Sequence, residues 1–175
     1  MARRTGLRLV TLSPHYRRAW MRMANEWHRS GKDRYDKMLT TANVSFNSLC
    51  REFRNQEKGR KLQKGYVPCT WFWMKAGDRI VGRISVRHTA IRGRPWTGFI
   101  GYDVAPSARG KGYATEALRL VLPYAKKIGF RSIDITCTKN NRASAKVIKR
   151  NGGVLIKHQY VPQEKETFSF FTIKL

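Results

Sequence analysis

The sequence predicts one α+β domain with a mixed central β-sheet, and three observations lead to this class. Segments with apolar residues at helical spacing alternate along the chain with short β-rich runs. The length of 175 residues is typical of a single domain with one hydrophobic core. The apolar fraction of 41% and the 20 aromatic residues (8 Phe, 7 Tyr and 5 Trp) exclude a disordered chain, although 27% of the residues are charged.

The first third of the chain predicts one strand followed by helices. Residues 7–12 alternate well enough for a strand, and Ser13-Pro14 is typical of a helix start, with an N-cap residue and proline at the first helical position. The helix that follows has its apolar stripe at Tyr16, Trp20, Met23, Ala24 and Trp27. Residues 30–65 are polar and rich in Arg and Lys, with one helix expected around Phe46–Phe53.

The remaining elements alternate between β-rich runs and helices. The expected strands are Val67–Met74, Ile80–His88, Trp96–Val104, Ile133–Thr138, Val154–Val161 and Phe168–Ile173. Helices are expected from Thr115 and from Asn141. The first two of these strands form a hairpin, because residues 75–78 read as a tight turn.

The turn between Val104 and Ala114 has the properties of a pyrophosphate site. Pro106 ends the strand by removing a ladder donor, and a helix starts after Ala114. Gly110 and Gly112 let the backbone approach a ligand closely, while the following helix N-terminus offers unpaired N–H groups and a positive dipole end. Arg109 and Lys111 add positive charge, so the segment predicts a phosphate-binding turn.

This turn is neither of two common phosphate loops. Lys111 is followed by Gly112 rather than by Ser or Thr, as a P-loop requires, and the third glycine of a dinucleotide fingerprint is missing. Arg109, Gly112 and Ala114 fill the pattern Arg/Gln-x-x-Gly-x-Gly/Ala, so the segment resembles the acyl-CoA-binding motif of the GCN5-related N-acetyltransferase (GNAT) family.

A second motif supports the same resemblance. Asn141-Arg-Ala-Ser144 opens a helix that ends at residues 151–153, Asn-Gly-Gly, and is similar to the second CoA-contacting element of the family, in the expected order. The resemblance covers roughly residues 80–160. It implies a single GNAT-like domain over residues 1–175, with about seven strands and about four helices.

The resemblance also implies an acetyl-CoA site. The strand ending at Val104 and the strand from Ile133 are expected to splay apart and hold the pantetheine arm, with the Val104 N–H facing the acetyl carbonyl. The residues implied to bind acetyl-CoA are Val104, Arg109, Gly110, Lys111, Gly112, Tyr113, Ala114, Asn141 and Ser144. One or two of Arg142, Lys146, Lys149 and Arg150 are candidates for the 3′-phosphate.

The catalytic acid and base are the part of the family pattern from which this sequence departs. Many members carry a tyrosine four residues after the small residue of the second motif, where this chain has Ile148. Asp103 is a candidate base, or else it pairs with one of the many arginines. Tyr160 is the candidate acid. Proximity of the two substrates is an alternative source of most of the rate.

The charge of the chain predicts a polyanionic partner. The sequence has 36 Lys and Arg residues against 11 Asp and Glu, a net charge of +25, which is more than one bound CoA needs. The family resemblance implies N-acetylation of a primary amine, and the charge favours an acceptor on a nucleic acid, such as tRNA or DNA, or on a nucleic-acid-bound protein. A small-amine acetyltransferase and a GNAT-like nucleic-acid-binding module are the alternatives.

The 51–64 region carries the densest run of positive charge outside the motifs. Its cations are either a solvated helix face or a patch for a polyanion on the acceptor side, and we favour the patch because six cations stand there against two acidic residues, Glu52 and Glu57. The cations are Arg51, Arg54, Lys58, Arg60, Lys61 and Lys64.

The cysteines, histidines and apolar segments indicate the compartment in which the protein works. Three scattered cysteines without C-x-x-C spacing fit reduced, buried or idle thiols, and four histidines far apart predict no metal site. No stretch reaches 18 apolar residues, and no apolar segment follows the basic N-terminus, so we expect a cytoplasmic protein without a membrane span. The pattern leaves monomer and dimer open.

Overall fold

The computed structural model describes residues 6–31 and 35–175; the basic start at 1–5 and residues 32–34 of the polar stretch lie outside the described part. The strands found there are β1 (Arg8–Val10), β2 (Cys69–Ala76), β3 (Arg79–Arg87), β4 (Ile100–Val104), β5 (Ser132–Thr138), β6 (Val154–Val161) and β7 (Glu166–Lys174). The α-helices are α1 (Arg17–Arg29), α2 (Asp36–Val44), α3 (Phe46–Glu57), α4 (Tyr113–Lys127) and α5 (Arg142–Arg150).

The seven strands form two antiparallel sheets. One has the order β1-β2-β3-β4 and the other the order β5-β7-β6. The sheets approach each other beside the start of β4, where the Phe99 N–H donates to the Asp134 carbonyl of β5 at 2.8 Å. The α+β class is confirmed. In place of one continuous sheet, the strands divide at the β4/β5 splay that the family resemblance implies.

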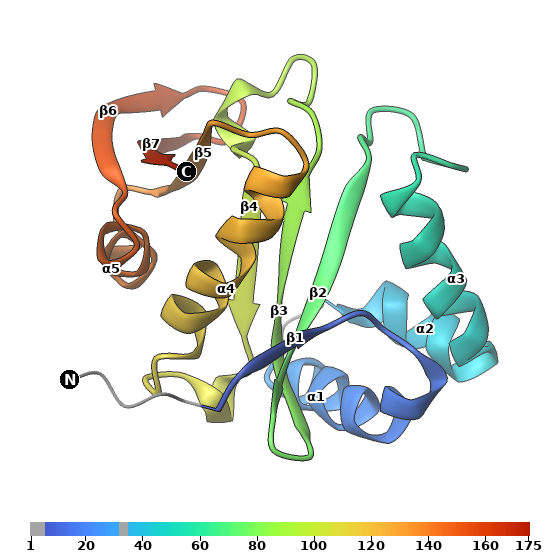
Figure 1. The fold of residues 1–175 in the computed structure, drawn as a ribbon. Coiled ribbons are helices and arrows are strands. Elements are labelled where there is room, and N and C mark those ends of the chain that lie inside the picture. The colour runs from blue at the N-terminus through green and yellow to red at the C-terminus, as the bar shows by residue number, and fades with distance from the viewer. Residues whose placement is uncertain (1–5, 32–34) are drawn as a thin grey trace.

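Helices cover both faces of the four-stranded sheet (Figure 1). Helices α1, α2 and α3 lie on one face, and α4 packs on the other against β1, β3 and β4. Helix α5 contacts α4 and β5, so it lies beside the splay. This arrangement leaves the C-terminal end of β4, the start of α4 and the start of α5 close to one another.

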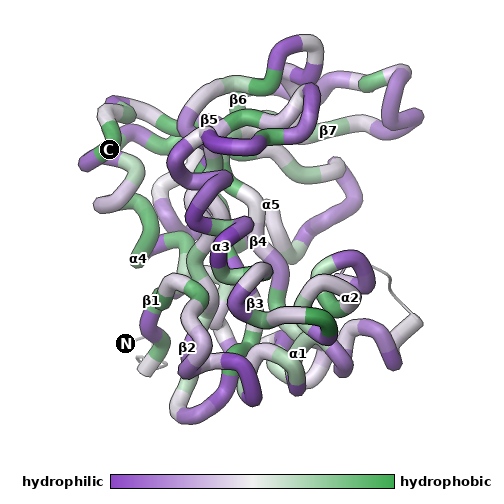
Figure 2. Tube along the Cα trace, turned by 90° about the vertical axis from the view of Figure 1, so that its right-hand side faces the viewer, coloured by the Kyte–Doolittle hydropathy of each residue, from purple (hydrophilic) through white to green (hydrophobic). Residues whose placement is uncertain are grey.

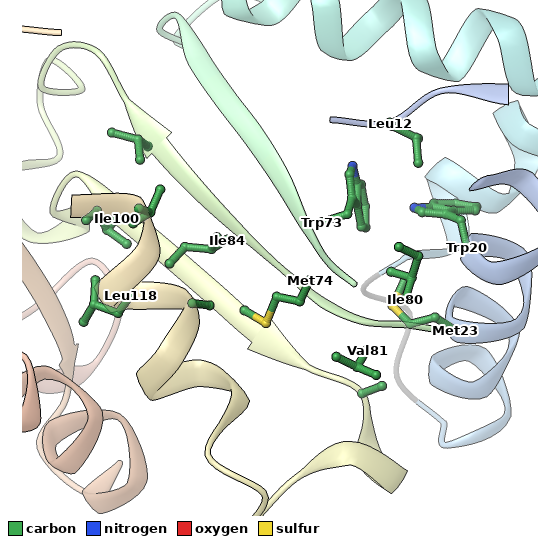
Figure 3. Packing of buried hydrophobic residues seen from close by; sticks show 14 of the residues in the cluster. Leu12, Trp20, Met23, Trp73, Met74, Ile80, Val81, Ile84, Ile100 and Leu118 are labelled. Atoms are coloured by element: carbon green, nitrogen blue, oxygen red, sulfur yellow. The ribbon is translucent and has the colours of Figure 1, made fainter. Parts of the chain in front are cut away.

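The core has a layer on each side of this sheet because neighbouring strand residues point to opposite faces. Trp73 of β2 packs edge-on against Trp20 of α1, with ring centroids 5.7 Å apart, whereas Met74 lies on the α4 side with Ile84 and Leu118 (Figure 3). All five side chains are fully buried. Hydrophilic residues gather in the peripheral loops, as Figure 2 shows.

Helix α2 is a difference from the sequence prediction, which had one helix in the whole polar stretch. Only Leu39 and Ala42 of α2 are buried, and its two threonines are weak helix formers, so its apolar pattern is faint. Tertiary packing against α1 and α3 stabilises it instead.

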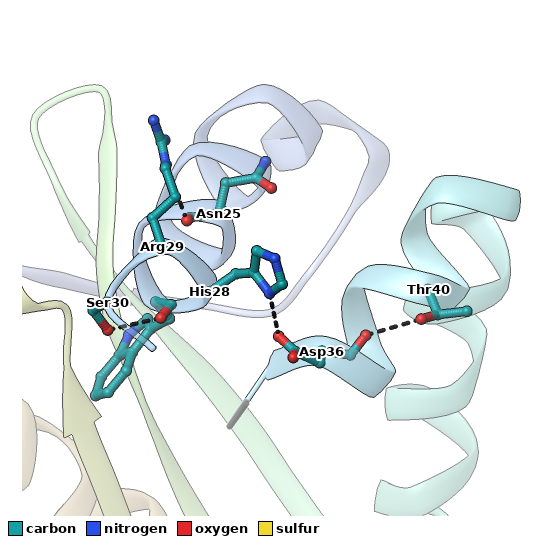
Figure 4. Close-up of polar contacts among 7 residues, drawn as sticks. Asn25, His28, Arg29, Ser30, Asp36 and Thr40 are labelled. Carbon is teal, nitrogen blue, oxygen red and sulfur yellow. Dashed lines mark hydrogen bonds and ion pairs between the residues drawn. The ribbon is translucent and has the colours of Figure 1, made fainter. Parts of the chain in front are cut away.

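A polar contact ties α2 to the end of α1. His28 of α1 and Asp36 of α2 lie with Nδ1 and Oδ1 3.0 Å apart (Figure 4). Within α2, the Thr40 hydroxyl donates to the Asp36 carbonyl at 3.1 Å. Tyr35, directly before α2, is completely buried against Trp20, Trp27 and Trp73. These contacts hold the first residues of α2 over the sheet.

Candidate active site

A cavity of about 640 Å³ opens between the end of β4, the glycine turn, the start of α4 and helix α5. Its volume lies in the range typical of small-molecule sites. Of the nine residues implied to bind acetyl-CoA, all but Lys111 line it, so the fold brings the two motifs together. The lining residues predicted from the sequence are Val104, Arg109, Gly110, Gly112, Tyr113, Ala114, Asn141 and Ser144.

The glycine turn has the backbone that a phosphate cradle needs. Gly112 directly precedes α4 with a left-handed φ of 82°, a conformation that favours glycine, and its carbonyl accepts the Glu116 N–H at 3.1 Å. Gly110 has a φ of 75° and open space where a Cβ would lie. Because Tyr113, Ala114 and Thr115 line the cavity, the positive N-terminal end of α4 borders it.

Contacts with α1 hold this turn in place. The Ser107 N–H and hydroxyl donate to the Glu26 carboxylate of α1 at 2.7 and 3.0 Å. The Arg109 guanidinium lies 5.2 Å from the Trp27 ring, and its Nε donates to the Val104 carbonyl at 3.3 Å. Lys111 is directed elsewhere, since its Nζ donates to the Ser107 carbonyl at 3.1 Å.

A hydroxyl pair joins β4 to α5 at the edge of the cavity. The oxygens of Tyr102 and Ser144 lie 2.7 Å apart, and both residues line the cavity. The Asn141 side chain caps α5 by accepting the Ser144 N–H at 3.0 Å, which fixes the position of Ser144. Burial raises the pKa of Tyr102 to about 12, so its phenol keeps its proton at neutral pH.

Asp103 is held in a polar network on the opposite side of β4. Its carboxylate pairs with Arg83 of β3, Nε to Oδ2 2.8 Å, and accepts a hydrogen bond from the Tyr35 hydroxyl. The Arg83 guanidinium also lies over the rings of Tyr35 and Trp71, at 4.9 and 4.6 Å. The Asp103 and Arg83 side chains are only 9% and 12% exposed. Of the two alternatives for Asp103, the arginine pair is thus present, and the residue is also among those that line the cavity.

The comparison with known families decides the identity. A family model described as the acetyltransferase (GNAT) domain matches residues 4–154 of this chain. The chain belongs to this family. The enzyme class and co-substrate predicted from the sequence, an acetyltransferase that uses acetyl-CoA, are those of GNAT enzymes.

Individual relatives agree with the family. The Probable N-acetyltransferase YjcK of Bacillus subtilis is 37% identical to this chain over 100 residues, which are 57% of this chain and 55% of that protein. The match therefore spans little more than half of the length of that relative. Among solved structures, RimL, a ribosomal L7/L12 alpha-N-protein acetyltransferase in complex with coenzyme A, has a TM-score of 0.69, 16% identity and coverage of 98% and 96%. Mycobacterium smegmatis RimJ in complex with CoA-disulfide has a TM-score of 0.70, 20% identity and coverage of 96% and 81%.

Tyr160, the candidate acid, does not line the cavity. It lies on strand β6, opposite Thr167, with 58% of the residue exposed. In its place the cavity has Tyr102, whose partner Ser144 is 42 residues away in the sequence. Alternation along β4 puts Tyr102 and Asp103 on opposite faces, a signal that could have singled out Tyr102.

The described residues contain neither a metal-binding cluster nor a membrane-spanning helix. In residues 6–31 and 35–175, no group of three or more His, Cys, Asp and Glu side chains is placed to hold a metal ion. No helix within the same ranges has the length and apolar character needed to cross a membrane.

Proposed function

We propose that this chain is an acetyl-CoA-dependent N-acetyltransferase that acts on a primary amine of a nucleic acid or of a nucleic-acid-associated protein. One observation carries the first part: a single cavity is lined by residues of both CoA motifs, which lie on different secondary structure elements. The excess of positive charge supports the acceptor class, because one CoA carries only a few phosphate charges while the chain has a net charge of +25.

Each part of the cavity suits one part of the co-substrate. The turn at Gly110 and Gly112 and the N-terminus of α4 bind the pyrophosphate, with Arg109 beside them. Lys146 and Arg150 of α5 line the cavity and supply cations for the 3′-phosphate. The pantetheine arm lies in the β4/β5 splay, and acetyl-CoA supplies the thioester whose carbonyl carbon receives the amine.

The chain contributes hydrogen-bond donors rather than a covalent nucleophile. In this proposal the Val104 N–H donates to the thioester carbonyl oxygen and favours the negative charge that develops there. The new C–N bond forms as the C–S bond breaks, and the amine proton leaves to water or to a base such as Asp103. The Ser144 hydroxyl protonates the departing thiolate, the Tyr102 phenol, 2.7 Å away, passes its proton to Ser144, and water returns a proton to the phenol.

The nature of one neighbour supports an acceptor of the translation machinery. RimL, which shares the fold, is a ribosomal L7/L12 alpha-N-protein acetyltransferase. The basic 51–64 region of this chain lies on α3 and the segment after it, on the face of the sheet opposite α4. A phosphate-rich acceptor therefore approaches from the side opposite the α4 N-terminus.

The test is acetyl transfer in a cell lysate. Purified protein is incubated with lysate and isotope-labelled acetyl-CoA, and mass spectrometry follows the label separately in the nucleic-acid, protein and small-molecule fractions. Label in the first or second fraction that depends on intact Gly112 supports the proposal. Label confined to small amines contradicts the acceptor class, and no enzyme-dependent label in any fraction contradicts the activity.

A further inference from the structure

A second cavity, of about 440 Å³, lies between α2, α3, β2 and residues 60–66. Arg83 forms part of its wall, whereas its ion-pair partner Asp103 forms part of the wall of the CoA cavity. The Arg83–Asp103 pair therefore stands between the two cavities. The pair thus links a residue that lines the α2–α3 cavity to a residue that lines the CoA cavity.

The α2–α3 cavity has a positive rim. Lys37, Arg60 and Lys61 line it with exposed side chains, and Glu52 is the acidic residue among the lining residues. Within residues 6–31 and 35–175, no ion pair or side-chain hydrogen bond of these three cations is found. The charge of Arg83 is matched by Asp103. The rim thus keeps an excess of positive charge for an anionic ligand.

The same cavity has an exposed aromatic ring and side-chain amides beside the cations. Tyr66 lines it and is 63% exposed, so its ring can be covered by a ligand. Gln63 and Asn55 also line it, and both have side-chain amides that can donate and accept hydrogen bonds. Exposed aromatic rings among cations are how proteins stack unpaired bases while binding their phosphates.

A smaller hollow of about 370 Å³ continues this surface across α3. Arg51, Arg54 and Lys58 line it, and it shares Asn55 and Arg60 with the α2–α3 cavity. The two hollows together, here called the basic track, run from the outer side of α3 to the Arg83–Asp103 pair. Cations follow the track along its length, as a chain of phosphates requires.

We propose that the basic track binds a single strand of nucleic acid, with a base stacked on Tyr66 and the phosphates held by Lys37, Arg60 and Lys61. A volume of about 440 Å³ lies in the range typical of small-molecule sites, which suits one unstacked nucleotide better than a duplex. The proposal rests on the acetyltransferase function proposed above and specifies its acceptor: an amino group on a single-stranded nucleic acid, presented beside the Arg83–Asp103 pair.

The experiment measures the affinity of the full-length protein for labelled 12-nucleotide oligomers by fluorescence anisotropy, using single-stranded RNA, single-stranded DNA and duplex DNA. The triple variant K37Q/R60Q/K61Q removes three charges from the track. The matched control K126Q/K127Q/R131Q removes three exposed charges at the end of α4, which line neither hollow. We expect the track variant to weaken single-strand binding at least about 10-fold, with a smaller salt slope, and the control to weaken it less than about 3-fold.

Stacking is tested separately from charge. Tyr66→Ala should weaken single-strand binding roughly 10-fold, whereas Tyr66→Phe, which keeps the ring, should leave it unchanged. The comparison of RNA with DNA shows which strand is the better ligand, and either outcome is consistent with the track.

Four results would overturn the proposal. Three concern the oligomers: no binding, equal weakening by the two triple variants, or duplex binding as tight as single-strand binding. The fourth is track-dependent binding of a polyglutamate peptide of the same length as tightly as the single strand. The last result would assign the track to an acidic protein. Calorimetry of CoA on the same variants separates this proposal from the activity. A wild-type protein that does not bind CoA contradicts the acetyltransferase function alone, and a CoA-binding protein without oligomer binding contradicts the track alone.

Discussion

Replacing Arg83 by methionine should destabilise the fold strongly, because it leaves the Asp103 carboxylate in a mostly buried place. Methionine keeps the unbranched stem and removes the charge. The Tyr35 hydroxyl would still donate to the carboxylate, but the cation 2.8 Å away would be lost. The guanidinium's position over the rings of Tyr35 and Trp71 would be lost too.

The structure sets the size of this effect. Both side chains of the pair are at most 12% exposed, so the surface value for ion pairs does not apply. Breaking a buried pair from one side typically costs about 3–5 kcal/mol in the free energy of unfolding. In a domain of this length each kcal/mol lowers the melting temperature by about 2–4 °C, which gives a fall centred near ~12 °C.

The assay is a double-mutant cycle followed by urea and thermal unfolding. Arg83→Met and Asp103→Asn should each destabilise the protein, and the double variant, which has no unpaired buried charge, should recover about 2 kcal/mol or more relative to Arg83→Met. The control is Arg119→Met on α4, which removes an exposed partner of Glu116 and should change the melting temperature little. A loss of less than about 1 kcal/mol in Arg83→Met would refute the reasoning that this pair is a buried structural element.

Three further predictions concern the CoA cavity. Gly112→Asp places a side chain and a negative charge at the phosphate turn and should abolish CoA binding in calorimetry. The control Gly152→Asp, also at a positive φ but outside the cavity, should leave CoA binding intact. Unchanged CoA affinity in Gly112→Asp would contradict the site. Tyr102→Phe should lower kcat roughly 10- to 100-fold, the usual range of acid–base contributions. Tyr160 is exposed, so Tyr160→Phe should leave kcat unchanged. A larger loss of kcat in Tyr160→Phe than in Tyr102→Phe would return the acid role to Tyr160. Because the pKa of Tyr102 is about 12 in the folded protein and about 10 when unfolded, its stabilising contribution is complete below pH 10 and declines as the pH rises to 12. Urea unfolding at pH 9 and pH 11.5 should therefore show a smaller alkaline loss of stability in Tyr102→Phe than in wild type, and equal losses would contradict the assignment.

The phosphate turn and the second-motif helix were determined by the sequence itself. A strand end, two glycines and a helix start lie within a few residues, and the requirements of each, such as the left-handed φ of Gly112, are local. The same holds for the Asn141 cap of α5, which bonds to a residue three positions on. Patterns of this kind predicted the family, the α+β class and eight of the residues that line the cavity, whereas Lys111 is directed elsewhere.

The tertiary structure alone decided which polar side chains of β4 meet partners on other elements. Arg83 and Asp103 meet because β3 and β4 are antiparallel in a register that places them opposite each other. Tyr102 and Ser144 meet because α5 packs beside the splay of the two sheets. Helix α2, which supplies Lys37 to the basic track, is stabilised mainly by its neighbours. The two polar pairs join residues 20 and 42 positions apart, and their energies depend on strand register and packing. The residues next to each partner in the sequence therefore give no signal of the contact.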